Sequence, residues 1–319
     1  MPPSTVPGEA AWPTQPVPTK PPAFDRQGVT EDDLIDFTPE LRQQALEYVK
    51  PYVLGPLYTP PSIRSDESEG KKGTLTIPGA WGAGNWHTGA FDPETGMYYA
   101  VSLTLPGVRA VTSTKGNSTA TMDYGSPGPS QQTNAPDFVA GLGPQVHGLP
   151  IVKPPYGRIT AFNLNSGDQV WMVANGDGPR DHPLLKDLRL PPLGVPNRPA
   201  PLVTKTLLFI GEGSDAVIGT PQVAWGWGKK FRAYDKATGQ VVWKTELSVI
   251  AVVRPRQPIN GMARRCRTSC TARCASSIAA SVCGLAAASE LAIVINPNGC
   301  RAFTHGRSFV EVYTHSSGS

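Results

Sequence analysis

The chain has 319 residues, of which 34 are Pro and 33 are Gly, so residues that interrupt regular structure make up about a fifth of it. This content argues against a helical bundle or a coiled coil, while 39% hydrophobic and 17% charged residues argue against wholesale disorder. The length fits either two average domains or one large β architecture.

Charge and residue types are distributed unevenly along the chain. The net charge is +4, but residues 248–319 contain eight Arg, no Lys and two acidic residues, whereas residues 1–247 contain 21 basic and 23 acidic residues. All five Cys lie in the C-terminal stretch, and all seven Trp lie before it. Two different kinds of sequence therefore meet near Leu247.

The first 30 residues are rich in Pro and predict extended surface backbone that wraps around another part of the protein. They have neither the basic region nor the continuous apolar core of a secretory signal. The sequence as given therefore predicts no secretory signal, and the expected location is cytoplasmic or undetermined.

One helix is expected, from Thr38-Pro39-Glu40 to about Val49. Thr38 supplies an N-cap hydroxyl, Pro39 suits the first helical position, and Pro51 follows as a stop signal. Apolar residues recur at steps of three and four, which predicts a packed surface helix.

From Lys72 onward, short apolar runs alternate with turn residues, which is typical of strands. We expect strands over Gly73–Pro78, Gly96–Thr104, Gly157–Phe162, Val203–Ile210 and Phe231–Tyr234. Residues 106–155 are rich in Gly, Ser, Thr and Pro and predict a long irregular insertion.

Three segments repeat without gaps: Ala90-Phe-Asp-Pro-Glu-Thr-Gly96, Ala161-Phe-Asn-Leu-Asn-Ser-Gly167 and Ala233-Tyr-Asp-Lys-Ala-Thr-Gly239. In a turn between two strands, the Asp or Asn accepts backbone hydrogen bonds, the Gly adopts positive φ, and the small Ala permits close packing. The second and third copies continue to Trp171 and Trp243, which we expect on the return strand, whereas the first has Ala100 instead. Such hairpins repeated around an axis build a β-propeller, and three unrelated hairpin turns are the alternative.

This pattern resembles the tryptophan-docking repeat of the pyrroloquinoline quinone (PQQ) dependent dehydrogenases, which are eight-bladed propellers. Other stretches are similar to the C-terminal part of the sugar and alcohol dehydrogenases of that family: Pro13 to Pro22, Gly82-Ala-Gly-Asn-Trp86, Asn175-Gly-Asp-Gly-Pro179 and Leu207 to Gly213. The resemblance covers residues 8–247 and implies an all-β partial propeller with a short N-terminal helix and an irregular C-terminal tail. Three segments are expected: a Pro-rich wrapping segment with one helix (1–71), the propeller repeats (72–247) and a tail outside the family pattern (248–319).

The resemblance also implies a chemistry. Such enzymes remove a hydride from a sugar or alcohol carbon to PQQ, with calcium as the usual metal, and the family is periplasmic. The catalytic Asp, the metal ligands and a Cys-Cys pair lie in the N-terminal half of the family's chain, and this sequence has no Cys-Cys pair. We therefore expect no catalytic residue and no metal ligand here, and a missing N-terminal half as a partner.

Two residues are candidates for contact with the cofactor, Asn85 and Trp86, because Gly84-Asn85-Trp86 resembles the Asn-Trp turn at the quinone. An Asn amide there would hydrogen-bond a quinone oxygen or carboxylate; the alternative is an ordinary turn Asn. Trp86 would line the same cavity, or simply pack beside the turn. His87 is interpreted as a surface or packed His rather than a proton carrier.

Other motifs have simpler interpretations. Asp177, Asp181 and His182 lack the spacing of a helix-loop-helix calcium site and predict a turn. Gly211 to Ala216 fits a relaxed dinucleotide fingerprint, but no helix follows it, so a strand-to-strand turn is expected. The Asn117-Ser-Thr119 sequon is uninformative without an export signal. In residues 275–295, the acidic Glu290 weighs against a membrane span.

The tail after Leu247 shows none of the family motifs. Its Cys266-x3-Cys270-x3-Cys274 spacing matches no standard zinc or iron-sulfur site, and its Arg residues lack the aromatic platforms of a specific nucleic-acid site. Enrichment in Arg, Ala, Ser and Cys is what a GC-rich gene read in a shifted frame produces. Our hypothesis is that the tail is a frameshift product, disordered or aberrant.

The sequence thus predicts a fragment of a PQQ-dependent dehydrogenase, inactive alone, with a sugar or alcohol substrate in the complete enzyme. Two alternatives stay open at this point. One is a non-catalytic propeller-like binding or scaffold protein, and the other is an unfolded pseudogene product.

Overall fold

The computed structural model describes residues 1–10, 12–65, 67–79, 82–84, 89–126, 143–212 and 228–246, together with the backbone of four strands in the tail. The chain divides into two compact units. The first comprises residues 1–85, 102–158 and 177–196, and the second comprises residues 86–101, 159–176 and 197–319. Each unit is built from segments that are far apart in the sequence.

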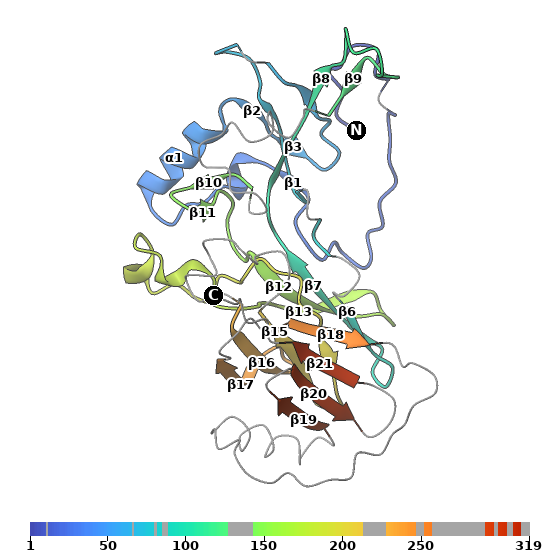
Figure 1. Ribbon diagram of the computed structural model, residues 1–319, viewed down its shortest axis with the longest axis vertical. Helices are drawn as coiled ribbons and strands as arrows, with labels where there is room; N and C mark the ends of the chain where they lie inside the picture. Colours follow the sequence, from blue (N-terminus) through green and yellow to red (C-terminus); the bar gives the residue numbers. More distant parts are fainter. Residues whose placement is uncertain are drawn as a thin grey trace. The chain divides into compact units, whose positions relative to one another are not determined.

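The first unit holds the α-helix and several short strands (Figure 1). Its helical elements are η1 (Glu31–Asp33), α1 (Pro39–Val49), η2 (Pro179–Asp181) and η3 (Lys186–Leu188). Its strands are β1 (Gly28–Val29), β2 (Tyr52–Val53), β3 (Gly55–Pro56), β4 (Ser62–Ile63), β5 (Gly73–Thr76), β8 (Gly107–Ser113), β9 (Tyr124–Gly125), β10 (Gln145–Val146) and β11 (Leu149–Pro150).

The predicted helix is confirmed as α1. The Thr38 side chain accepts a hydrogen bond from the Leu41 amide at 3.2 Å, and Pro39 occupies the first turn. Leu41, Ala45 and Val49 are buried on one face. They join the core of the first unit, which also contains Leu34, Ile35, Leu75, Ile77, Val146, Leu149, Ile151, Val152, Tyr156, Leu185 and Leu193. Burial of this apolar surface is the main term that holds the helix in place.

The second unit is made of sheets. Its strands are β6 (Gly89–Asp92), β7 (Met97–Leu103), β12 (Gly157–Asn163), β13 (Asp168–Ala174), β14 (Leu202–Val203), β15 (Leu207–Gly211), β16 (Lys230–Asp235) and β17 (Val241–Glu246). The last two residues of β7 and the first two of β12 belong to the first unit. They form two four-stranded sheets in the orders β13-β12-β7-β6 and β14-β15-β16-β17. Four tail strands, β18 (Val252–Arg256), β19 (Leu291–Asn296), β20 (Gly299–Thr304) and β21 (Phe309–Tyr313), form a further sheet.

Two expectations about strands need correction. The predicted strand over Val203–Ile210 is a hairpin of β14 and β15. The Thr204 amide donates to the Leu207 carbonyl, and the Leu207 amide donates to the Thr204 hydroxyl, which closes the turn. Residues 106–155 are not one irregular insertion. They begin with the seven-residue strand β8, which pairs with β5 so that Leu75 faces Val108. Residues 127–142 of that stretch lie outside the described residues.

The predicted mechanics of the repeat turns are confirmed. Gly96, Gly167 and Gly239 have φ of 71°, 73° and 73°. The side-chain oxygens of Asp92, Asn163 and Asp235 accept hydrogen bonds from the backbone amides two residues further on, at 3.2, 2.9 and 3.0 Å. Each motif therefore closes a β-hairpin, as the sequence predicted.

The first repeat does not form a sheet of its own. Its hairpin β6–β7 shares a sheet with the second hairpin, β12–β13. Ala100 therefore lies on an inner strand and is 5% exposed, whereas Trp171 lies on the outer strand β13. The third repeat closes the next sheet, on β16 and β17.

Lys236, in the third turn, joins the two sheets of the second unit. Its backbone carbonyl accepts hydrogen bonds from the Tyr99 hydroxyl and the Trp171 indole N–H, each at 3.2 Å. Its ammonium group donates to Asp92 Oδ2 at 2.6 Å, with the two side chains 11% and 6% exposed. The Trp171 ring also lies against Gly239, where a Cβ atom would come within 2.7 Å of it.

Burial opposes ionisation of Asp92, but hydrogen bonds from Lys236, Thr95 and the Glu94 amide outweigh it, so its pKa lies below the usual value. Burial raises the pKa of Tyr99 to about 12, so its hydroxyl keeps the proton that it donates to Lys236. Lys236 therefore forms one charged pair, with Asp92, and accepts hydrogen bonds from two neutral donors, Tyr99 and Trp171.

We predict that Trp171→Phe lowers the free energy of unfolding by about 1 kcal/mol more than Trp243→Phe does, because only Trp171 loses a hydrogen bond to Lys236. Trp243 is the matched control: it has the same place in the third repeat, and its indole N–H has no hydrogen-bond partner among the described residues. Urea unfolding followed by circular dichroism measures both. Equal losses of unfolding free energy in the two variants would show that the hydrogen bond from Trp171 to Lys236 does not stabilise the fold.

We predict that Asp92→Asn lowers the free energy of unfolding by about 3 kcal/mol at pH 7, because it leaves the buried Lys236 ammonium without its counter-charge. The pKa of Asp92 is lowered on folding, so the contribution is present above its ordinary value of 3.8 and is lost as pH falls through the lower folded value. The gap between wild type and variant should therefore narrow below about pH 4.

The control for this prediction is Asp235→Asn, at the same position of the third turn. The pKa of Asp235 is also lowered, mainly by hydrogen bonds from Thr238, but no cation pairs with it among the described residues. Its effect should stay within about 0.5 kcal/mol. An Asp92→Asn variant as mild as this control would show that the Asp92–Lys236 pair contributes little.

Candidate functional site

The two residues expected at the cofactor, Asn85 and Trp86, lie outside the described residues, as does His87. Residues 82–84, which directly precede them in the chain, are described. The structure therefore shows how the chain is held immediately before Asn85, and the cofactor role of Asn85 and Trp86 stays a prediction.

Gly79 and residues 82–84, which precede Asn85, are held by the end of β7 and by the chain that follows it. The Leu103 amide donates to the Ala83 carbonyl at 2.9 Å, and the Gly79 amide donates to the Leu105 carbonyl at 3.0 Å. The Gly82 amide closes a turn onto the Gly79 carbonyl at 3.1 Å. Gly82 has φ of +70°, which favours glycine at this point of the turn.

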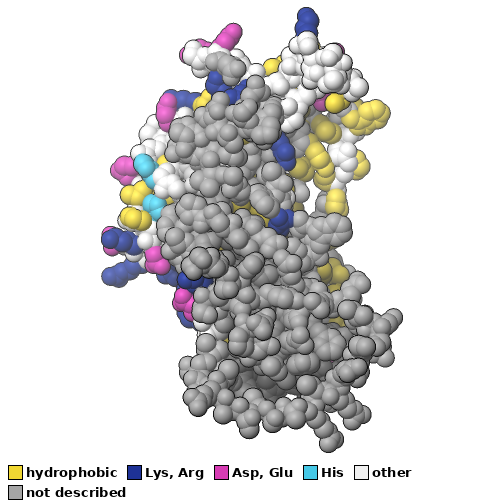
Figure 2. Space-filling view, viewed as in Figure 1, with side chains coloured by type: hydrophobic (Ala, Val, Ile, Leu, Met, Phe, Trp, Pro, Cys, Tyr) yellow, Lys and Arg dark blue, Asp and Glu magenta, His cyan; other side chains and the backbone are white. Residues whose placement is uncertain are grey.

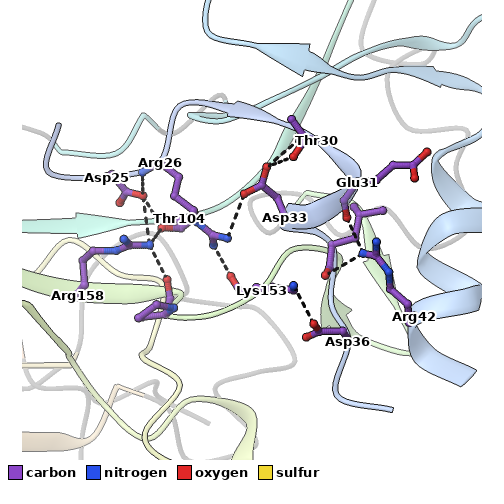
Figure 3. A network of polar contacts seen from close by, with 12 residues as sticks. Asp25, Arg26, Thr30, Glu31, Asp33, Asp36, Arg42, Thr104, Lys153 and Arg158 are labelled. Atoms are coloured by element: carbon purple, nitrogen blue, oxygen red, sulfur yellow. Dashed lines mark hydrogen bonds and ion pairs between the residues drawn. The ribbon is translucent and has the colours of Figure 1, made fainter. Parts of the chain in front are cut away.

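Thr104, which lies between Leu103 and Leu105, forms a buried polar cluster with Asp25 and Arg158 (Figure 3). The Thr104 hydroxyl donates to Asp25 Oδ1 at 2.5 Å and accepts from the Arg158 guanidinium at 2.5 Å. Arg158 and Asp25 also form an ion pair at 3.4 Å, with side chains 8% and 3% exposed. Thr104 thus lies between a buried acid and a buried base.

Arg26 connects this cluster to the neighbouring segments. Its amide donates to Asp25 Oδ1 at 2.7 Å, its guanidinium donates to the Lys153 carbonyl, and it lies 4.0 Å from Asp33. Lys153 in turn pairs with Asp36 at 2.8 Å on the more exposed side of the network (Figure 3). The Pro-rich N-terminal segment is thereby tied to the residues before α1 and to residues 153–158.

Burial and neighbouring charges shift the pKa values of the residues in and beside the cluster. Burial lowers the pKa of Arg26, and the nearby Arg158 lowers it further. Burial lowers the pKa of Arg158 as well, against the opposing effect of Asp25, and burial raises the pKa of Tyr156. In the cluster and in its neighbours Arg26 and Tyr156, four buried polar atoms have no hydrogen-bond partner: Asp25 Oδ2, Arg26 Nε, Arg158 Nε and the Tyr156 hydroxyl. A cluster with unsatisfied groups stabilises little, and its value lies in fixing one arrangement of the chain.

The chemistry available at this site follows from its burial. Asp25, Thr104 and Arg158 have almost no contact with solvent, so they hold backbone in place rather than meet a substrate. The Asn85 amide has a donor and an acceptor that would suit the oxygens of a quinone acid, and its contact with a cofactor stays a prediction. Within the described ranges, no three His, Cys, Asp or Glu side chains gather as a metal site requires.

The other residues singled out in the sequence have structural surroundings. Asp177 lies 3.7 Å from Arg180, and its carbonyl accepts from the Leu193 amide. Asp181 ends the short helix η2. The His182 ring contacts the His147 carbonyl and accepts from the Leu184 amide, and Figure 2 shows histidine side chains together at the surface. The predicted turn is therefore present at residues 177–182.

Glu212, in the motif from Gly211 to Ala216, has a buried partner. Its carboxylate forms an ion pair with Arg232 on β16, and both side chains are at most 5% exposed. Residues 213–216 of the fingerprint lie outside the described residues, as do all five Cys side chains and the residues 275–290 weighed as a membrane span. In the described part of the chain, no helix has the length and apolar character to cross a bilayer.

Sequence reasoning missed Asp25, Arg26, Thr104 and Arg158. A signal was present in part: Ser102 and Thr104 are polar residues at alternate positions of an apolar run, and Arg158 opens another apolar run. Polar residues on the buried face of a strand need partners, which points to a polar cluster. Nothing in the sequence indicates that Asp25, 79 residues before Thr104, is one of them.

We predict that Asp25→Asn lowers the free energy of unfolding by about 3 kcal/mol, because the buried Arg158 loses its counter-charge. Asp36→Asn is the control within the same network, since the Asp36 and Lys153 side chains are 55% and 36% exposed and such a pair contributes at most about 1 kcal/mol. Thermal and urea unfolding compare the two. If both variants lost the same small amount, the buried pair would not restrain the chain.

Comparison with known proteins gives a consistent result. The family model "Glucose/ethanol/alcohol dehydrogenase, beta-propeller domain" (PQQ) matches residues 1–257. The glycerol dehydrogenase large subunit of Gluconobacter thailandicus is 27% identical over 267 residues, which cover 77% of this chain and 33% of that protein. Quinate/shikimate dehydrogenase (quinone) of Acinetobacter baylyi is 25% identical over 258 residues, 76% of this chain and 29% of that protein. The chain thus spans about a third of the length of these relatives.

Among solved structures, the quinohemoprotein alcohol dehydrogenase of Comamonas testosteroni is similar to this chain, with 15% sequence identity and a TM-score of 0.34. The similarity covers 81% of this chain and 32% of that one. A superposition of this quality carries no argument, so the assignment rests on the family match.

The expected all-β partial propeller with a short N-terminal helix is confirmed, and the two four-stranded sheets closed by the repeat turns are its blades. The tail was expected to be irregular, but four of its segments form the sheet β18-β21-β20-β19. The family match over residues 1–257 includes the three repeats, the turn before Asn85 and the cluster around Thr104. The chain belongs to the PQQ-dependent glucose/ethanol/alcohol dehydrogenase β-propeller family.

Proposed function

We propose that this chain is part of a dehydrogenase that oxidises a sugar or alcohol with PQQ, and that it contributes one wall of the cofactor site through Asn85 and Trp86. The observation that carries the proposal is the family match over residues 1–257. The backbone hydrogen bonds of Gly79, Gly82 and Ala83 support it, because a cofactor contact needs a backbone of fixed geometry.

In this proposal the residues of the chain bind and orient. When bound, PQQ accepts the hydride that leaves the carbon bearing the substrate hydroxyl. The Asn85 amide would donate to one cofactor oxygen and so hold the ring in one orientation, while Trp86 would exclude water beside it. The hydroxyl proton of the substrate needs a general base, and calcium needs oxygen ligands. We assign both to residues outside this chain, in the two thirds of the relatives that it does not span.

It follows that the chain alone should not turn over substrate. An incomplete ring of blades leaves one sheet edge unpaired and half of the cofactor's surroundings absent. The missing N-terminal half is the partner that we propose for it, either as a separate polypeptide or as the remainder of a longer chain.

We predict saturable binding when PQQ with calcium is titrated into the purified chain in a calorimeter, and binding at least about tenfold weaker for Asn85→Ala, because the amide hydrogen bonds are lost. Asn117→Ala is the control, since Asn117 lies in an exposed turn and its oxygen accepts only from Thr119 among the described residues. PQQ-dependent dye reduction should be absent from the chain alone and appear only with a complementing N-terminal segment of a relative.

Each other outcome has a definite meaning. No binding by a chain that unfolds cooperatively would favour a propeller-like binding or scaffold protein. No binding together with no cooperative transition would indicate an unfolded product. Robust dye reduction by the chain alone would contradict the proposed need for a partner.

A further inference from the structure

The three residues Leu103, Thr104 and Leu105, which end β7 and follow it, connect two features of the first unit. The backbone of the two leucines holds the segment before Asn85 at both ends, through Leu103 to Ala83 and Gly79 to Leu105. The residue between them, Thr104, has its side chain in the buried cluster. The cluster and the segment thus share one short piece of backbone.

Thr104 itself is restrained by three hydrogen bonds. Its hydroxyl donates to Asp25 and accepts from Arg158, and its amide donates to the Tyr156 carbonyl at 2.8 Å. Because the hydroxyl has a fixed acceptor on one side and a charged donor on the other, its rotamer and the position of its backbone are set together. The side chain is fully buried, so water cannot replace either partner.

The packing of the segment leaves little freedom to move relative to this backbone. A Cβ atom on Gly79 would lie 2.8 Å from the Leu105 carbonyl oxygen and 2.9 Å from the Gly107 amide nitrogen. Such a close approach of two backbones is possible only with glycine. A shift of Thr104 and its neighbours would therefore move Gly79 and Ala83, and Asn85 lies two residues after Ala83 in the sequence.

We propose that Asp25 and Arg158 are positioning residues that act through Thr104 to fix the turn before Asn85, and so place the Asn85 amide for the cofactor. The part that concerns the cofactor rests on the proposed function. Neither residue contacts the cofactor in this proposal, because both are buried in the cluster. Their effect is on the orientation of the turn.

The test uses the full chain with three substitutions. Thr104→Val removes the hydroxyl while keeping the shape of the side chain, and Thr104→Ser keeps the hydroxyl. Thr74→Val is the matched control, because Thr74 is also fully buried and donates one hydrogen bond, to the Pro60 carbonyl at 2.7 Å, away from the turn. Two quantities are measured: hydrogen exchange of the Gly79 and Leu103 amides, and the dissociation constant of PQQ with calcium.

For Thr104→Val we expect exchange at Gly79 and Leu103 to accelerate about tenfold and the dissociation constant to rise about tenfold, the loss expected for one buried hydrogen bond. Thr104→Ser should restore both. Thr74→Val should change neither beyond its effect on global unfolding. Equal behaviour of Thr104→Val and Thr74→Val would overturn the proposal, as would faster exchange with an unchanged dissociation constant.

The two proposals fail in different ways. If the wild-type chain binds no PQQ, the proposed function and the cofactor part of this inference fail together. The exchange of the Gly79 and Leu103 amides still decides whether Thr104 fixes the turn, since that measurement needs no cofactor. If Thr104→Val fails to fold, Asp25→Asn supplies the variant with a weakened cluster, and Thr104→Ser remains the variant that keeps the hydroxyl.

Discussion

The second unit depends on one buried ion pair, between Lys236 and Asp92. A buried ammonium group is tolerated only when an acid faces it, so the third repeat turn has to lie against the first. Once Lys236 is placed, its carbonyl is in position to accept from Tyr99 and Trp171, and Gly239 meets the Trp171 ring. A turn motif that is local in sequence thereby fixes how two sheets meet.

The first unit uses the same device at a different place. Asp25 lies between the Thr104 hydroxyl and the Arg158 guanidinium, and Arg26 lies beside them. Two arginines with one buried acid are not an efficient way to gain stability, as the unpartnered atoms of the cluster show. Apolar side chains of similar volume would pack as well, but they would not set the rotamer of Thr104 or the position of Leu103 and Leu105.

The local parts of this fold could be predicted from the sequence, and the non-local parts could not. The cap and stop of α1 and the three turn motifs are written in adjacent residues, so their hydrogen bonds and positive φ values were predictable. The assignment of the first two hairpins to one sheet was not, because it depends on which strands pair across a gap of more than 50 residues. The cluster around Thr104 was missed for the same reason, since Asp25 and Arg158 lie 133 residues apart. The strand β8 was missed because its Gly, Thr and Ser residues resemble a loop when its partner β5 is not known.

The placement of the buried acids also bears on the proposed oxidation. Asp25, Asp92 and Glu212 are the buried acids of the described residues, and each faces a buried base: Arg158, Lys236 and Arg232. A general base must reach the hydroxyl proton of a substrate, whereas these three carboxylates are buried and form ion pairs with basic side chains. The one Asp25 oxygen without a partner has no contact with solvent. The buried charges of the described residues therefore serve to position backbone, and none of these three carboxylates is placed to act as the general base of the proposed oxidation.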